Sequence, residues 1–202
     1  MHSTFQYQKN PNFPNRYISP KSLQNFLQEN LSDYITLIGT STLGEPIYQF
    51  SYGSGDIKVL AWSQMHGNES NSTHCMLDLW YSLESQPQLK EKLFQNISLD
   101  FIFMLNPDGS KVWSRRNSLD IDMNRDYLQN ASCEMKLLKE IAFSKKYDYA
   151  LNLHEQRTIF STDGKNPATL SFLAPSEDYD RTITENRKKS MAVIASIYNV
   201  LR

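Results

Sequence analysis

The stretch IKVLAWSQMHGNESNST, residues 57–73, decides the fold of this chain. Residues 57–64 are mostly apolar and include β-branched side chains, which is typical of a buried strand. Residues 65–73 are polar and contain several helix-capping residues. The stretch therefore predicts a buried strand that leads through a chemically capable loop into a helix.

Strands and helices alternate on both sides of this stretch. Residues 76–83 place apolar side chains at helical spacing and predict the helix that follows the loop. The other predicted elements are a helix at 21–31, two strands within 34–53 joined by a turn at 43–46, strands at 97–105 and 149–153, short strands at 158–161 and 168–173, and helices at 133–144 and 180–202. This alternation predicts an α/β fold with a mixed, mostly parallel β-sheet flanked by helices.

Length and composition fit one soluble globular domain. The chain has 202 residues, of which 40% are hydrophobic and 21% charged, enough for one sizeable core. Residues 1–33 are predicted to be a lead-in or a short cap, and residues 34–202 the main domain. The net charge of -1 gives no electrostatic reason to expect nucleic acid or a membrane surface as a partner.

The sequence shows no targeting or cysteine motif. No basic segment followed by an apolar run opens the chain, and no apolar stretch reaches the roughly 18 residues of a membrane span, so a cytoplasmic location is the default expectation. Cys75 and Cys133 fit neither a disulfide framework nor a metal motif.

Polar side chains follow three of the predicted strands, at 66–69, 106–109 and 154–155. The carboxyl ends of parallel strands meet at one edge of a sheet, where ligands bind. His66, Glu69 and His154 would there supply two imidazoles and a carboxylate, the set that commonly holds catalytic zinc with an open fourth position. The same set can hold non-haem iron, so the ligand types alone leave the metal open.

The segment NPDGSKVWSRRNSLDIDMNR, residues 106–125, completes a series of ordered motifs. The series is GTSTLGEPI (39–47), HGNE (66–69), NPDG (106–109), RRN (115–117), DMNR (122–125) and LNLH (151–154). In this order the motifs resemble those of the zinc carboxypeptidase family, which includes the pancreatic carboxypeptidases. The resemblance implies that family's phosphorylase/hydrolase-like sandwich, one zinc ion, and hydrolysis of C-terminal peptide bonds by metal-activated water.

The resemblance also implies roles at the metal. His66, Glu69 and His154 match the three zinc ligands, and Asp122 resembles the carboxylate that orients the first ligand histidine. Such a carboxylate fixes the tautomer of the histidine and raises its basicity.

Further roles concern the substrate. Arg115 resembles the arginine that polarises the scissile carbonyl and stabilises the oxyanion, although its neighbour Arg116 is an alternative. Asn124 and Arg125 resemble the pair that binds the substrate's C-terminal carboxylate, which suits the bidentate fork of arginine. Without the resemblance, these charges would be interpreted as a solvated loop with surface ion pairs.

The family's general-base glutamate has no match after His154. Glu155 adjoins a ligand, but neighbouring strand residues face opposite ways. The other acidic residues there are Asp163, Glu177, Asp178, Asp180 and Glu185. The chain is therefore predicted to be the N-terminal part of the domain, to lack C-terminal strands, and to be inactive as it stands. Asp120 and Glu155–Gln156 also depart from the family pattern and suggest a divergent bacterial-type member.

Two alternatives stay open. A zinc-dependent deacylase of N-acyl amino acids would share the fold and also bind a free carboxylate. A non-catalytic zinc-binding domain would explain the missing glutamate. The expected partner is a peptide or small acyl-amino acid with a free C-terminal carboxylate.

Overall fold

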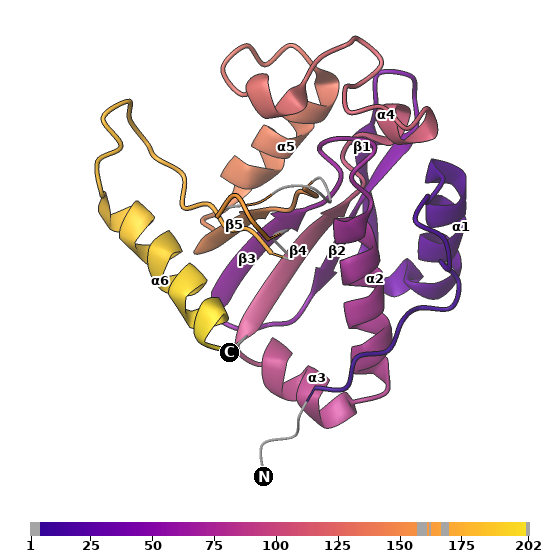
Figure 1. Cartoon of the computed structure of the whole chain (residues 1–202). Coiled ribbons are helices and arrows are strands. Elements are labelled where there is room, and N and C mark those ends of the chain that lie inside the picture. Colours follow the sequence, from indigo (N-terminus) through magenta and orange to yellow (C-terminus); the bar gives the residue numbers. More distant parts are fainter. Residues whose placement is uncertain (1–4, 157–160, 162, 167–169, 201–202) are drawn as a thin grey trace. The chain divides into compact units, whose positions relative to one another are not determined.

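A five-stranded mixed sheet with the order β1-β2-β4-β3-β5 is the frame of the structure (Figure 1). The strands are β1 (Ile35–Thr40), β2 (Pro46–Tyr52), β3 (Ile57–Trp62), β4 (Ile97–Phe103) and β5 (Tyr149–Asn152). β3 pairs in parallel with both β4 and β5, whereas β2 is antiparallel to β1 and β4. The predicted α/β class with a mixed sheet is confirmed, but the described sheet is not mostly parallel, since two of its four pairings are antiparallel.

The computed structural model describes residues 5–156, 161, 163–166 and 170–200. The chain divides into two units, Met1–Glu155 and Gln156–Arg202, which are described separately. The first unit contains the whole sheet, the helices α1 (Pro20–Asn30), α2 (Asn71–Glu84), α3 (Pro87–Phe94), α4 (Pro107–Lys111) and α5 (Cys133–Ser144), and the 3₁₀ turns η1 (Ser32–Tyr34) and η2 (Met123–Arg125).

Helices cover both faces of this sheet, because strand residues alternate between two hydrophobic clusters. Phe50 and Phe101 belong to the cluster that α1, α2 and α3 complete, whereas Leu60 and Ile102 belong to the cluster of α5. The connection from β3 to β4 contains α2 and α3, and the connection from β4 to β5 contains α5. The strand order thus reverses about β3, and at such a point an open α/β sheet binds its ligands.

The helix ends follow the local sequence. Ser19 caps α1 by accepting a hydrogen bond from the Ser22 N–H, and Pro20 occupies the first turn, where its missing N–H costs nothing. Ser132 caps α5 by accepting the Met135 N–H, so the helix covers the predicted residues 133–144. Helix α3 was not predicted.

Residues 5–33, predicted to be a lead-in or cap, contribute to the main core. Phe13, Ile18, Leu23 and Leu27 are buried in the same cluster as α2 and strands β2 and β4. The segment before α1 is therefore held by apolar contacts as well as by polar ones.

The second unit contains the helix α6 (Glu185–Val200). The prediction of a helix from residue 180 was wrong for residues 180–184, because Arg181 has a positive φ of 58° and the Thr184 hydroxyl accepts the Arg187 N–H at the helix start. Of the two short strands predicted near this unit, residues 158–160 and 168–169 lie outside the described residues, and Ser161 and residues 170–173 are not strands. None of the described helices is long and apolar enough to cross a membrane.

A buried carboxylate joins strands on the α5 side of the sheet. Asp100, on β4, accepts hydrogen bonds from Ser51 Oγ at 2.7 Å and Tyr147 OH at 2.6 Å, and pairs with Lys145 Nζ at 2.6 Å. Burial by itself would raise the pKa of Asp100, but these partners hold it below its ordinary value of 3.8. Burial raises the pKa of Tyr147, and the hydrogen bond to the Asp100 carboxylate acts in the same direction.

Replacing Asp100 with asparagine should reduce the free energy of unfolding by about 1–3 kcal/mol at pH 7, because charged hydrogen bonds are lost. Since the folded pKa is depressed, the charged form stabilises the fold above the ordinary pKa and loses that effect as the pH falls through the folded pKa. Urea titrations at pH 7 and pH 3 should show a smaller acid loss for Asp100→Asn than for the wild type or for the exposed control Asp120→Asn. Equal losses in all three proteins would contradict this.

Candidate metal centre

The loop after β3 places His66 and Glu69, and the buried side chain of Gln64 shapes it. Gln64 has a positive φ of 48°, and its Nε2 donates to the Gly67 carbonyl oxygen at 2.9 Å. Thr73 Oγ1, on α2, donates to Gln64 Oε1 at 2.5 Å. The Glu69 N–H then donates to the His66 carbonyl at 3.1 Å and closes the turn.

Two glycines allow the HGNE and NPDG loops to touch. A Cβ on Gly67 would lie 2.2 Å from the Gly109 carbonyl carbon and the Ser110 nitrogen. A Cβ on Gly109 would lie 2.5 Å from the Arg116 carbonyl oxygen. Both positions therefore require glycine because other backbone approaches too closely. This contact fixes the loop that contains His66 against the loop that contains Arg115.

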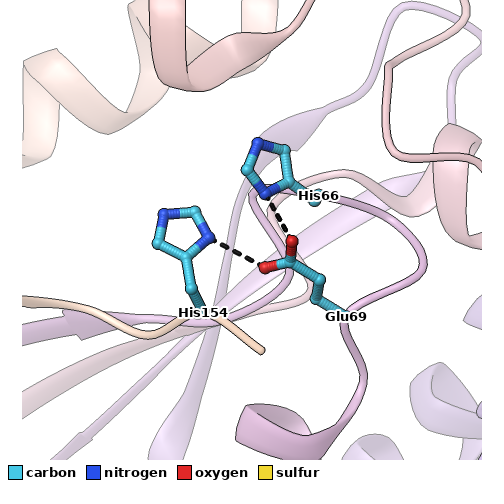
Figure 2. A group of neighbouring side chains, drawn as sticks. All are labelled: His66, Glu69 and His154. Atoms are coloured by element: carbon cyan, nitrogen blue, oxygen red, sulfur yellow. Dashed lines mark hydrogen bonds and ion pairs between the residues drawn. The ribbon is translucent and has the colours of Figure 1, made fainter. Parts of the chain in front are cut away.

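His154 reaches the same place from β5. The parallel register pairs Trp62 with Asn152, and the Leu153 N–H donates to the Trp62 carbonyl at 3.1 Å. His154 is therefore held next to the loop that follows β3. One ligand atom from each of His66, Glu69 and His154 lies within 4.8 Å of the other two (Figure 2).

The Glu69 carboxylate lies between the two histidines (Figure 2). His66 Nδ1 is 2.8 Å from Oε1, and His154 Nδ1 is 2.8 Å from Oε2. The Glu155 N–H also donates to Oε2, at 3.0 Å. Burial by itself would raise the pKa of Glu69, but the hydrogen bonds from His154, His66 and the Glu155 backbone lower the pKa to about 2. Glu69 is therefore an anion at neutral pH.

Asp122 and Arg115 surround this carboxylate. Asp122 Oδ1 lies 3.0 Å from His66 Nε2, on the opposite side of the ring from Glu69. Arg115 bridges the two acids, with Nη1 3.2 Å from Glu69 Oε1 and Nε 3.2 Å from Asp122 Oδ2. Burial would raise the pKa of Asp122, but the His66 hydrogen bond and the Arg115 charge lower it.

In the structure, Arg115 and Arg116 contact different groups. Arg116 turns to Asp120, donating to its carbonyl at 2.8 Å and lying 3.4 Å from its carboxylate. Of the two arginines that the sequence offered, Arg115 is the one in contact with Glu69 and Asp122.

Asn124 and Arg125 follow Asp122 in the η2 turn. The Asp122 carboxylate caps this turn by accepting the Asn124 N–H at 3.1 Å. Asn124 Oδ1 lies 3.5 Å from Asn152 Nδ2 at the end of β5. Arg125 is exposed and donates to the Asn124 carbonyl at 3.2 Å, and among the described residues no carboxylate forms an ion pair with it. Its guanidinium thus keeps donors for a ligand.

Buried carboxylates give this long loop its shape. Glu134, on α5, accepts the Thr42 N–H at 3.0 Å and Asn117 Nδ2 at 3.2 Å. Asn117 Oδ1 in turn accepts the backbone N–H groups of residues 119 and 121, at 3.1 and 3.0 Å. Asp126 similarly accepts the Ser132 N–H at 2.9 Å. The loop between Arg115 and Arg125 is therefore ordered by Asn117, whose amide binds the loop backbone and is itself held by the buried Glu134 carboxylate.

The donor set fits zinc. Two imidazole nitrogens and one carboxylate converge and leave a fourth position, which is the ligand set of catalytic zinc sites. Asp122 faces the His66 nitrogen that points away from Glu69, as the orienting carboxylate of a metal-bound histidine does.

Sequence patterns did not reveal Gln64 or Glu134 as determinants of the site. Gln64 looked like the polar end of an apolar strand, and Glu134 like one of several charges on a helix. Both are fully buried. Glu134 binds Thr42 and Asn117, and Gln64 also binds Ser110, all outside their own segments of the chain, so local patterns do not mark these contacts.

Removing the Glu134 carboxylate should destabilise the first unit. Glu134→Ala leaves the buried Asn117 amide and the Thr42 N–H unpaired, which should lower the free energy of unfolding by roughly 2–4 kcal/mol. Glu140→Ala, an exposed change on the same helix, should stay within about 0.5 kcal/mol of the wild type. Urea unfolding measures both, and a wild-type midpoint for Glu134→Ala would contradict this role.

Comparison with known proteins agrees with the geometry. The profile of the zinc carboxypeptidase family, Peptidase M14, matches residues 21–160. Carboxypeptidase 2 of Trichophyton rubrum is 29% identical over 100 residues, which are 48% of this chain and 19% of that protein, so the chain spans about a fifth of the length of the curated relatives it matches.

Solved structures share the fold. The metallo-carboxypeptidase from Burkholderia cenocepacia superposes with a TM-score of 0.59 at 20% identity, covering 69% of this chain and 42% of that one. Carboxypeptidase A from Helicoverpa armigera gives a TM-score of 0.59 at 17% identity, covering 70% and 46%. Because the family profile spans well over half of the sequence, the chain belongs to the zinc carboxypeptidase family.

Proposed function

We propose that this protein is a zinc-dependent metallocarboxypeptidase that hydrolyses C-terminal peptide bonds. The observation that carries the proposal is the group of His66, Glu69 and His154, whose ligand atoms lie within 4.8 Å of one another, with Asp122 behind His66. These three residues would hold one zinc ion. When bound, the ion would activate a water molecule and polarise the scissile carbonyl.

The protein's own groups prepare the site for that ion. With a metal bound, Asp122 Oδ1 would accept a hydrogen bond from the His66 Nε2–H, and Nδ1, which faces Glu69, would then be free to bind the ion. The depressed pKa of Glu69 keeps it charged at neutral pH, so that no proton has to leave before a cation binds.

Arg115 is proposed to stabilise the negative charge that develops on the substrate carbonyl. Its side chain is 46% exposed, so substrate can reach it, and its Nη1 already lies 3.2 Å from a metal-ligand oxygen. A fixed cation at this place favours an oxyanion over the neutral carbonyl, and such a preference lowers the barrier to acyl transfer.

Arg125 and Asn124 are proposed to bind the C-terminal carboxylate of the substrate. Arg125 is exposed, with a backbone carbonyl as its hydrogen-bond acceptor. A guanidinium presents two parallel N–H donors to a carboxylate, and the neighbouring Asn124 amide adds a neutral hydrogen bond. Asn124 lies next to Asn152 at the end of β5, and His154 comes shortly after this strand.

No general base is assigned to a residue of the chain. Glu155, the acidic neighbour of His154, uses its carboxylate oxygens to bind Arg16 and the Asn71 N–H. The proposal is therefore tested first by binding of metal and substrate analogues, and turnover is a later question.

Loss of a ligand should weaken zinc binding strongly. Competition with a chromophoric chelator should show a fall in zinc affinity of at least about 100-fold for Glu69→Gln, because one of three protein ligands is lost, and of about 10–100-fold for Asp122→Asn. Asp120→Asn, an exposed change in the same loop, should bind zinc as the wild type does. If all three variants keep wild-type affinity, the metal centre lies elsewhere.

If Asn124 and Arg125 bind a carboxylate, the chain should prefer peptides with a free C-terminus, and a substitution at Arg125 should remove this preference. The zinc-loaded chain should bind a blocked dipeptide with a free C-terminal carboxylate more tightly than the same peptide amidated. Arg125→Gln should weaken binding of the acid by about 10-fold or more, since a charged hydrogen bond is worth about 1.5–3 kcal/mol, and Arg116→Gln should not. Calorimetry with both peptides measures this.

Equal affinity for the acid and the amide would contradict this role of Asn124 and Arg125. An N-acyl amino acid that binds more tightly than the blocked dipeptide would favour the deacylase alternative.

A further inference from the structure

An extended N-terminal segment, residues 5–16, runs along α2 and is held by a ladder of polar side chains. The ladder residues recur at every fourth position, which places them on one face of the helix and at its two ends. They are Ser70, His74, Asp78, Ser82 and Gln86. We call residues 5–16 the N-terminal strap.

Backbone groups of the strap bind this ladder in order. Gln86 Oε1 accepts the Gln6 N–H at 2.9 Å, and Asp78 Oδ1 accepts the Asn10 N–H at 2.8 Å. At the other end, the Arg16 carbonyl accepts Ser70 Oγ at 2.6 Å and lies 3.1 Å from His74 Nε2. The strap therefore delivers Arg16 to a fixed point at the start of α2, close to Glu69.

The Arg16 side chain forms an ion pair with Glu155. The Glu155 carboxylate also accepts the Asn71 N–H at 3.3 Å, and its own backbone N–H donates to Glu69 Oε2 at 3.0 Å. Glu155 thus links the strap, the first turn of α2 and the metal-ligand carboxylate. Its side chain is 10% exposed, whereas that of Arg16 is 60% exposed.

Among the described residues, the segment that contains His154 is held mainly by the pairing of β5 with β3 and by the hydrogen bonds that His154 and Glu155 make to Glu69. β5 is an edge strand, and its four residues are all exposed. Strand residues with few packing contacts open easily, so the position of a ligand at the end of such a strand depends on local hydrogen bonds. Glu155 comes directly after His154 in the chain, so its hydrogen bonds help to fix the position of His154.

We propose that Arg16 is a positioning residue of the metal centre, which acts through Glu155 to hold His154 against Glu69. The inference rests on the proposed function, because it assumes that these residues bind the metal. In this proposal Glu155 connects the N-terminal strap to Glu69, so the strap helps to hold the metal ligands in position.

The test compares zinc affinity with the stability of the metal-free chain, both measured on the 202-residue chain. Arg16→Gln and Glu155→Gln should each weaken zinc binding by about 10-fold, the lower end of the effect of residues that orient a ligand. Arg16→Lys and the exchange Arg16→Glu with Glu155→Arg should recover part of the loss. Lys111→Gln, which removes an exposed ion pair with Glu45 elsewhere in this unit, should bind as the wild type does.

The metal-free unfolding midpoint distinguishes positioning from simple destabilisation. It should move no more for Arg16→Gln than for Lys111→Gln. Wild-type zinc affinity in Arg16→Gln, or a loss that tracks the unfolding midpoint, would overturn the inference while leaving the proposed function intact. A wild-type chain that binds no zinc would instead overturn the proposed function.

Amide hydrogen exchange of the metal-free chain tests whether the Arg16–Glu155 ion pair holds this segment. Arg16→Gln should speed exchange of the Glu155 N–H, which donates to Glu69, by about 10-fold and leave the N–H groups inside α5 unchanged. Unchanged exchange at Glu155 would show that Arg16 does not hold this segment, whatever the zinc result.

Discussion

One carboxylate, that of Glu69, holds the functional end of the sheet together. It receives His66 from the loop after β3, His154 and the Glu155 N–H from the end of β5, and Arg115 from the loop after β4. A carboxylate surrounded by such partners stays ionised although it is largely buried. The other residues of the site position these groups around the Glu69 carboxylate.

The topology of the sheet brings these groups together. The chain crosses to β4 on one face and returns to β5 on the other, so β3 lies between two parallel neighbours whose ends point the same way. The loops from all three ends therefore converge. Gly67 and Gly109 let two of the loops touch, the buried Gln64 binds the backbone of the first loop at Gly67, and the buried Glu134 binds the Asn117 side chain of the second. The loops that contain His66 and Arg115 are thus held against each other, and Arg125 remains exposed to solvent.

Local sequence was sufficient for those parts of the fold that depend on local patterns. The strand predicted at 57–64, which ends at Trp62 in the structure, the amphipathic helix behind it and the capped helix at 133–144 could be predicted, because apolar periodicity and capping residues are local signals. The ordered motifs indicated the ligand group as well. Helix α3 was missed because it is short, and the start of α6 was misplaced because a turn at Arg181 has no strong sequence marker.

Long-range polar contacts could not be predicted in the same way. The face of α2 that carries Asp78 and Ser82 looks solvated in sequence, but its partner is a strap whose residues precede them by about seventy positions. Arg16 lies in a segment without a clear pattern, and only the folded chain shows that it meets Glu155. Such pairs are set by the way the strap crosses the helix, and that path is a property of tertiary packing.

Zinc K-edge absorption spectroscopy of the chain loaded with one equivalent of zinc would identify the atoms that bind the metal. We expect a four-coordinate shell of nitrogen and oxygen at about 2.0–2.1 Å, with the multiple-scattering pattern of two imidazoles. This pattern should drop to that of one imidazole in His154→Ala. Sulfur at about 2.3 Å, which would come from Cys75 or Cys133, or a shell without imidazole, would contradict the assignment of His66, Glu69 and His154 as the metal ligands.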